Sequence, residues 1–182
     1  MSIALIAAAL LWSQDPTGSA AIDACRAPGA PIDAEHAEDA IDCLVTAIYA
    51  PGQLELIEPL GDDAARLFSR AALADLTAAQ ARAGGEVAPG LDADPFCACQ
   101  DAGGLTILVR ATQVSSDGTG SVAIVFTFQP VTENMTTEEL EALLLPENRT
   151  SLRLDLVHEG DGWRVDDIVG GEGGSFRQSL QP

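Results

Sequence analysis

The spacing of hydrophobic residues changes near the middle of the chain. Between residues 34 and 84 the apolar residues recur every three or four positions, which is the spacing of one face of an α-helix. From residue 105 onward, apolar and polar residues alternate in short runs separated by turn residues, which is typical of half-buried strands. Helices followed by strands predict an α+β fold, with N-terminal helices packed on one face of a curved antiparallel sheet.

Two helices are predicted in the first half. The first lies in residues 32–51, with Asp33 as its N-cap and Pro51 as its stop. Its buried stripe is expected to consist of Ala37, Ile41, Leu44, Val45 and Ile48. The second runs through residues 62–85 and ends at Gly84. Its buried stripe is expected to consist of Phe68, Ala72, Leu76, Ala79 and Ala83.

Two strands and a short helix are predicted next. In residues 105–114 the alternation places Arg110 on the opposite face from four apolar residues. These are Leu105, Ile107, Val109 and Ala111. In residues 121–128 the residues sharing a face are Val122, Ile124, Phe126 and Phe128. The segment TTEELEALL predicts a helix capped by Thr136 or Thr137.

A β-hairpin is predicted around residues 160–161. In this register His158 faces Trp163 and Leu154 faces Asp167, so Asp167 falls on the apolar surface. Burial of an unpaired carboxylate costs several kcal/mol, so Asp167 needs a partner. One interpretation is structural, because the carboxylate caps helix amides or pairs with an arginine. The alternative is catalytic, with Asp167 as general base and His158 assisting.

The charge of the chain excludes several classes of function. Its formal net charge is -19, its nine basic residues are all arginines, and it contains no lysine. Such an acidic chain is repelled by nucleic-acid phosphates and by anionic lipid head groups, so neither is an expected partner. The lack of lysine excludes a P-loop and a Schiff-base lysine, and no zinc-protease or serine-hydrolase motif occurs.

The N-terminus predicts export. Residues 3–12 form an apolar run of the length of a signal-peptide core, and small residues follow at Gly18 and Ala20. We therefore expect a signal peptide at residues 1–20, a lead-in segment at 21–34 and a single α+β domain at 35–182. A buried N-terminal helix is the alternative to the signal peptide. Export places the mature protein in the bacterial periplasm or outside the cell, without membrane attachment after cleavage.

Four cysteines in an exported chain predict disulfide bonds. Cys43 lies opposite the apolar stripe of the first helix, where the lead-in carrying Cys25 can fold over it. This leaves Cys97 and Cys99 for each other, which requires a tight turn. Crossed pairing between the helix and the C-x-C segment is the alternative. The C-x-C spacing fits zinc and redox sites poorly, so we interpret this segment as scaffolding between helix and sheet, without metal or cofactor.

Two segments carry a family resemblance: DPFCACQD at residues 94–101 and GWRVDDI at residues 162–168. Their motif positions, apart from the cysteines, are Asp94, Pro95, Phe96, Gln100, Asp101 and Trp163. With them the chain resembles, over residues 35–180, a bacterial family of exported proteins of unknown function. That family is similar in fold to the nuclear-transport-factor-two-like superfamily. The resemblance implies a cystatin-like cone, in which a curved sheet wraps against helices around a pocket.

Members of that superfamily include isomerases and dehydratases with a carboxylate in the cone, as well as binding modules without catalysis. Our preferred hypothesis is an exported module that binds a small ligand or a basic protein. The alternatives are an isomerase or hydratase using Asp167, and an acidic inhibitor or immunity-type protein. The sequence leaves open whether the protein is an enzyme and whether it forms a homodimer.

Overall fold

The protein is described here from a computed structural model, over residues 18–26, 34–84, 93–170 and 174–182. Most of the predicted signal peptide and the predicted cap Asp33 lie outside these residues. The helices are α1 (Ser19–Ala24), α2 (Ala34–Tyr49), η1 (Leu54–Leu56), α3 (Ala64–Leu67), α4 (Arg70–Ala83), α5 (Thr137–Leu143), η2 (Pro146–Asn148) and α6 (Phe176–Ser179). The strands are β1 (Thr106–Val114), β2 (Thr119–Thr127), β3 (Thr150–Glu159) and β4 (Gly162–Gly170).

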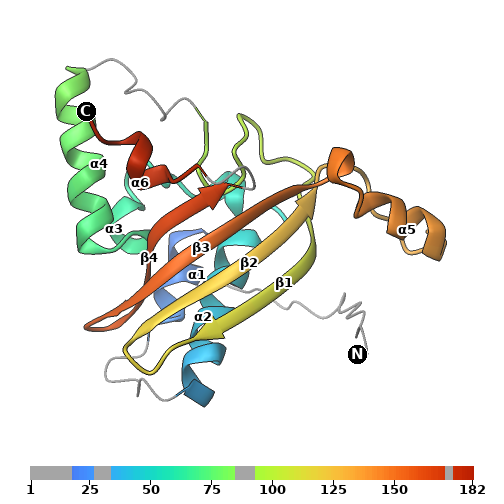
Figure 1. Cartoon of the computed structure of the whole chain (residues 1–182), viewed down its shortest axis with the longest axis horizontal. Coiled ribbons are helices and arrows are strands. Elements are labelled where there is room, and N and C mark those ends of the chain that lie inside the picture. Colours follow the sequence, from blue (N-terminus) through green and yellow to red (C-terminus); the bar gives the residue numbers. More distant parts are fainter. Residues whose placement is uncertain (1–17, 27–33, 85–92, 171–173) are drawn as a thin grey trace.

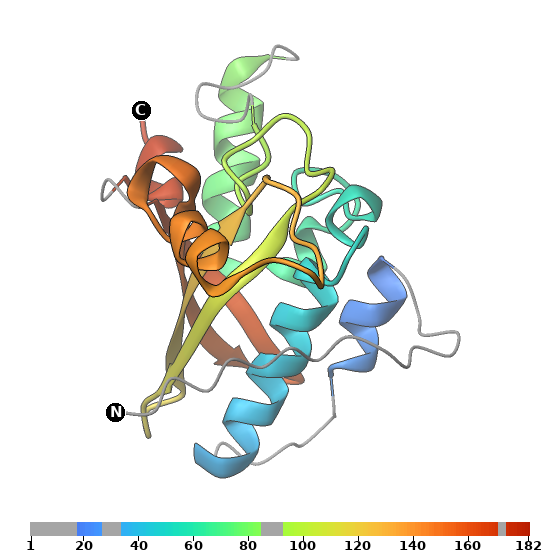
Figure 2. The same ribbon diagram turned by 90° about the vertical axis from the view of Figure 1, so that its right-hand side faces the viewer.

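The four strands form an antiparallel sheet in the order β1-β2-β3-β4, and the sheet is not closed. Helix α2 lies against one face of the sheet and α1 packs against α2, while α3, α4 and α6 gather beside β4 (Figure 1). The view along the sheet shows α1 and α2 on the same side (Figure 2). The predicted α+β class is therefore confirmed. No helix in the described residues has the length and apolar character needed to span a membrane.

Helix α2 carries the predicted buried stripe. Ala37, Ile41, Leu44, Val45 and Ile48 are each at most 3 % exposed. The helix lies close to the sheet, because a Cβ added at Gly120 would sit 3.0 Å from Ile41 Cδ1 and 3.4 Å from the Trp163 ring. Each fully buried isoleucine, leucine or valine of the stripe contributes about 1.5–3 kcal/mol to folding. The stripe therefore fixes α2 on the sheet.

A disulfide joins the end of α1 to α2. It connects Cys25 and Cys43 with an S–S distance of 2.05 Å and a Cα–Cα distance of 5.5 Å, which confirms the predicted pairing. On the chain-entropy model, a loop of this length contributes about 3 kcal/mol to stability. Ile22 of α1 is fully buried. Export and signal cleavage remain predictions.

The single helix predicted over residues 62–85 is wrong, because the chain breaks between α3 and α4. Phe68 has extended backbone and forms a parallel bridge with Val165 of β4. The Ser69 N–H donates to the Val165 carbonyl at 2.9 Å, and the Ser69 Oγ accepts from the Ala72 N–H as the N-cap of α4. Hydrogen bonding to the sheet thus overrides the continuous helical pattern. The predicted stop at Gly84 is confirmed by its left-handed φ of 64°.

The predicted face of β1 is wrong beyond its first residues. A register shift between Ile107 and Val109 reverses the alternation, so Val109 is 44 % exposed. Arg110 turns instead toward α2, where its guanidinium donates to Asp42 at 2.9 Å. One inserted residue in an antiparallel strand moves every later side chain to the other face.

A second bulge corrects the predicted hairpin. His158 pairs with Trp163 as predicted, but the register shifts between Asp155 and Leu156, so that Asp155 pairs with Asp167 and Leu154 pairs with Ile168. Asp167 therefore lies on the opposite face from Leu154, and the prediction that both share the apolar surface is wrong. Trp163 and Leu154 are both buried, as expected for that surface.

Candidate functional site

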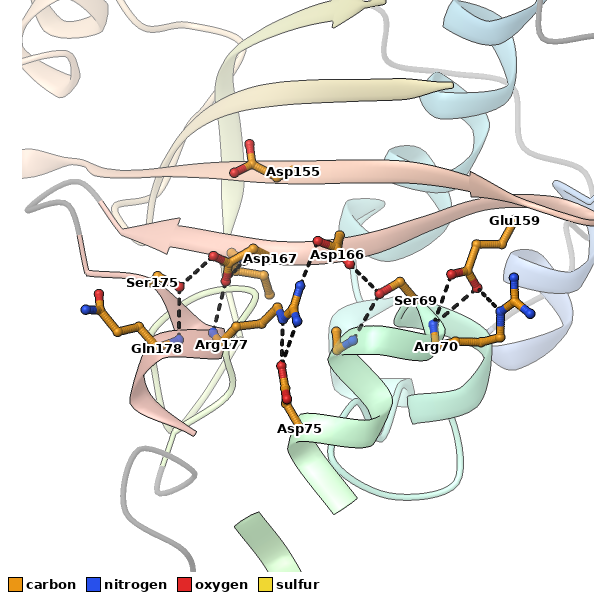
Figure 3. Close-up of polar contacts among 12 residues, drawn as sticks. Ser69, Arg70, Asp75, Asp155, Glu159, Asp166, Asp167, Ser175, Arg177 and Gln178 are labelled. Carbon is orange, nitrogen blue, oxygen red and sulfur yellow. Dashed lines mark hydrogen bonds and ion pairs between the residues drawn. The ribbon is translucent and has the colours of Figure 1, made fainter. Parts of the chain in front are cut away.

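The bulge in β4 gives rise to a cluster of polar side chains, here called the β4 clasp, shown in Figure 3. Its residues are Ser69, Asp75, Asp166, Asp167, Ser175 and Arg177. Asp166 is the inserted residue of the bulge, and it accepts hydrogen bonds from Ser69 Oγ at 2.5 Å and from the Arg177 guanidinium at 2.9 Å. Since Ser69 caps α4 and Arg177 belongs to α6, Asp166 joins two helices to one strand.

Asp167 binds the first turn of α6, whose N-cap is Ser175. Its Oδ1 accepts from the backbone N–H of Ile168 at 2.8 Å and of Arg177 at 3.0 Å, while its Oδ2 accepts from Ser175 Oγ at 2.5 Å. Carboxylates beside helix N-termini are stabilised by the free amide groups of the first turn. These contacts match the structural interpretation of Asp167. Its role as general base remains an untested prediction.

Arg177 is the cation of the clasp and pairs with two of its three carboxylates. It donates to Asp75 of α4 at 2.8 Å as well as to Asp166. The hydrogen bond that Arg177 donates to Asp75, together with the charge of Asp166, raises the pKa of Arg177 above its ordinary value, although partial burial opposes the rise. The clasp therefore holds a permanent cation between carboxylates from α4 and β4.

The structure does not bring His158 close to Asp167. His158 stacks edge-on against Trp163, with ring centroids 5.5 Å apart, at the hairpin end of the sheet. Its partner Trp163 lies four residues before Asp167 on β4, which is about 13 Å along a strand. The two side chains also lie on opposite faces. A catalytic pair of His158 and Asp167 is therefore not assembled.

The second site is the segment of residues 94–99, here called the cysteine turn. Cys97 and Cys99 form the predicted disulfide, with a Cα–Cα distance of 5.1 Å. The Asp94 N–H donates to the Cys99 carbonyl at 2.8 Å, which closes the turn. Between the cysteines, Ala98 has a φ of 52° and is the one non-glycine residue with positive φ in the part of the chain that the structure describes. This conformation costs an ordinary residue about 1–2 kcal/mol.

Phe96 anchors the cysteine turn to the core. Its side chain is fully buried and stacks on Phe68 with centroids 5.8 Å apart. The Tyr49 hydroxyl at the end of α2 donates to the Phe96 carbonyl at 2.7 Å. The turn thus connects the end of α2, the α3–α4 break and the sheet. This geometry agrees with the interpretation of the segment as a pinned connection.

An open groove of about 520 Å³ borders the cysteine turn. It is lined by Glu58, Pro59, Leu60, Gly61, Ala93, Asp94, Cys99 and Gln100. Two of these residues are acidic and none is basic. Leu60 and the buried Pro59 supply an apolar floor beside the carboxylates. The groove is therefore suited to a ligand that carries positive charge next to an apolar group.

The pKa of one groove residue, Asp94, departs from its ordinary value. Burial raises the pKa of its carboxyl, and the hydrogen bond from the Phe96 N–H at 2.7 Å offsets part of this rise. Burial, and then the charge of Asp94, also raises the pKa of Tyr49 well above its ordinary value. Asp94 therefore retains a proton at a higher pH than an exposed aspartate does.

Within the described residues, no three histidine, cysteine or acidic side chains are grouped closely enough to hold a metal ion. The cysteines are paired with each other.

Comparison with known proteins gives no match: no protein-family model, no curated protein and no solved structure is similar to this chain. The family resemblance of residues 94–101 and 162–168 accordingly remains a prediction.

Sequence reasoning singled out the cysteine turn but missed its groove. The missing wall is the loop at residues 58–61, which carries no motif and comes next to Asp94 only through folding. It also missed Ser69, Asp75 and Arg177 as partners of the two adjacent aspartates. The serine-containing break before residue 70 was the available signal, because serine is a preferred N-cap.

Proposed function

We propose that this protein is an exported binding module that recognises a basic partner, a cationic peptide or a basic protein, through the groove beside the cysteine turn. The observation that carries the proposal is the lining of that groove, where Glu58 and Asp94 face an opening without any basic residue. The net charge of -19 adds a long-range attraction for cations.

Two further features support this assignment. Disulfides persist in oxidising compartments, and the pairs at Cys25–Cys43 and Cys97–Cys99 support a periplasmic or secreted location. For the fold, we propose a variant of the cystatin-like or nuclear-transport-factor-two-like cone. An antiparallel sheet with helices against one face is the feature that supports this finer assignment.

The test is titration of the protein with a fluorescently labelled arginine-rich peptide, followed by fluorescence anisotropy at low and at physiological salt. The double variant Glu58→Gln/Asp94→Asn is expected to weaken binding about tenfold, because two groove carboxylates lose their charge. Binding should also weaken as salt rises.

The matched control is Glu38→Gln/Asp39→Asn. It removes the same charge from exposed positions on α2, about 16 Å along the helix from Tyr49 and the cysteine turn. If both double variants lose affinity equally, the peptide senses only the net charge of the protein, and the groove is not its binding site.

A further inference from the structure

The disulfide of the cysteine turn adds little net stability to the fold. On the chain-entropy model a bridge that spans a single intervening residue contributes about 1.5 kcal/mol, against about 3 kcal/mol for the Cys25–Cys43 bridge. Holding Ala98 at a φ of 52° consumes an energy of similar size. Phe96 already anchors the segment through its buried ring. A purely structural role therefore explains this bridge poorly.

The two cysteines of this bridge are also unequally exposed. Cys99 lines the groove, whereas Cys97 is only 1 % exposed and belongs to the hydrophobic core. An incoming thiol can therefore approach Cys99 from the groove, while Cys97 is shielded. A partly exposed cysteine that lines a groove, paired with a buried one, gives thiol–disulfide exchange a single preferred point of attack.

We propose that the Cys97–Cys99 disulfide is redox-active and oxidises pairs of thiols in cysteine-containing peptides or proteins that enter the groove. Reduction releases Ala98 from its left-handed conformation, so the reaction relieves backbone strain. The inference goes beyond the proposed function, and it rests on that function only for the positive charge of the substrate.

The exchange proceeds in two balanced steps. A substrate thiolate attacks Cys99, the Cys97–Cys99 bond breaks, and Cys97 leaves as a thiolate that takes up a proton. A second substrate thiolate then attacks the substrate sulfur of this mixed disulfide, which forms the substrate disulfide and releases Cys99. Two substrate thiols are oxidised and the protein disulfide is reduced to two thiols. A low-molecular-weight disulfide, such as oxidised glutathione, restores the bridge by the reverse exchange.

Asp94 is placed to support this chemistry as a positioning residue. Its backbone carbonyl accepts from the Cys97 N–H at 3.3 Å, and its side chain borders the groove. Since burial raises its pKa, its carboxyl is a proton source at a higher pH than an exposed aspartate. Cys97, which leaves as the thiolate, and the carboxyl of Asp94 thus belong to the same short turn.

The first test equilibrates the full chain in glutathione buffers of graded composition, with thiol alkylation and peptide mapping by mass spectrometry. The Cys25–Cys43 bridge is the internal control. We expect Cys97 and Cys99 to become reduced at a value of [GSH]²/[GSSG], where GSH and GSSG are reduced and oxidised glutathione, about tenfold lower than the control, a difference equivalent to the strain at Ala98. Near-ultraviolet circular dichroism should stay unchanged. If both bridges open together, or if the fold is lost when Cys97–Cys99 opens, the bridge is structural and the inference is wrong.

The second test uses single variants and a peptide containing an internal disulfide. Cys97→Ser leaves Cys99 free at the groove, so it should accumulate a mixed disulfide with the peptide. Cys99→Ser leaves the shielded Cys97 and should accumulate at least tenfold less adduct. Equal adduct with both variants, or adduct with neither, contradicts the inference; circular dichroism verifies that each variant is folded.

The third test separates the inference from the proposed function. Turnover of a fluorescent dithiol peptide with excess oxidised glutathione is compared between an arginine-flanked and a glutamate-flanked peptide. Faster oxidation of the arginine-flanked peptide supports both proposals. Equal rates for the two peptides contradict the preference for a basic partner but leave the redox activity standing. No oxidation of either peptide, in a protein that still binds the arginine-rich peptide, contradicts the redox activity alone.

Discussion

The β4 clasp and the cysteine turn both place aspartates beside an irregularity of the backbone, but their surroundings differ. In the clasp, the bulge presents Asp166 and Asp167 to amides, hydroxyls and the Arg177 guanidinium. In the cysteine turn, a hydrogen bond from Phe96 does not offset the burial of Asp94, whose pKa stays raised. Carboxylates satisfied by the protein stabilise the fold, whereas an acid left partly unsatisfied beside a groove is available to a ligand.

The largest expected effect comes from removing the carboxylate that binds the first turn of α6. Asp167→Ala deletes the acceptor of two backbone amides and of Ser175, so we expect a loss of about 2 kcal/mol in the free energy of unfolding. In thermal melts this corresponds to a fall in Tm of roughly 4–8 °C for a chain of this size.

Its control is Asp155→Ala, the residue paired with Asp167 across the strands, whose ion pair with Arg153 is largely exposed. This variant should change stability by no more than about 0.5 kcal/mol. Equal losses in the two variants would mean that the Asp167 carboxylate contributes nothing beyond a charge at the strand end.

A smaller loss is expected from the cation of the clasp. Arg177→Ala separates α6 from Asp75 and Asp166 and leaves these carboxylates facing each other, at a cost of about 1 kcal/mol because the group is partly exposed. Urea unfolding measures this difference.

The matched variant is Arg70→Ala, which removes an arginine whose side chain is 87 % exposed in its ion pair with Glu159. Its effect should lie near zero. If Arg70→Ala destabilises as strongly as Arg177→Ala, the ion pairs of Arg177 contribute no more to stability than an exposed ion pair does.

The smallest effect is expected in the cysteine turn, and with the opposite sign. The folded-state pKa of Asp94 is raised, so its ionisation lowers stability as the pH rises from the unfolded pKa through the folded pKa. Asp94→Asn keeps an oxygen that can accept from Phe96 but cannot ionise. We expect its Tm at pH 7 to exceed that of the unmodified protein by roughly 1–3 °C.

At pH 3 Asp94 is protonated in both states, so the gain should disappear. Asp39→Asn, at an exposed position, controls for the change in net charge. A gain of the same size at both pH values would show that the amide improves packing rather than removing a buried charge.

Local pattern predicted the elements where a single buried face decides the structure. The stripe of α2, the strand core of β2, the capping box at Thr136 and the turn at residues 160–161 follow from spacing and turn chemistry. Each of these signals lies within about 20 residues of sequence. The alternation also predicted that Phe128 shares the face of Val122, Ile124 and Phe126. Phe128 instead follows the last residue of β2 and is 40 % exposed.

The errors share one physical cause. The break at Phe68 and the bulges at residues 108 and 166 are set by pairing with a second segment of the chain, which the hydrophobic spacing within one segment does not encode. The helical spacing of apolar residues continues across the break at Phe68, and the strand alternation continues across both bulges, so neither irregularity was predicted. A one-residue bulge does not change the hydrophobic pattern of the sequence, yet it places Asp167 on the face opposite the apolar surface.

The amino-acid sequence by itself determined the acidic character and the α+β class, since these follow from composition and periodicity. The pairing of Cys25 with Cys43, for which the sequence left a crossed alternative, was decided by the folded chain. Only the tertiary structure decided which aspartates are satisfied and which acid borders a groove. The reason is that solvation and hydrogen-bond partners depend on residues such as Glu58 and Arg177, which approach Asp94 and Asp166 only when the chain is folded.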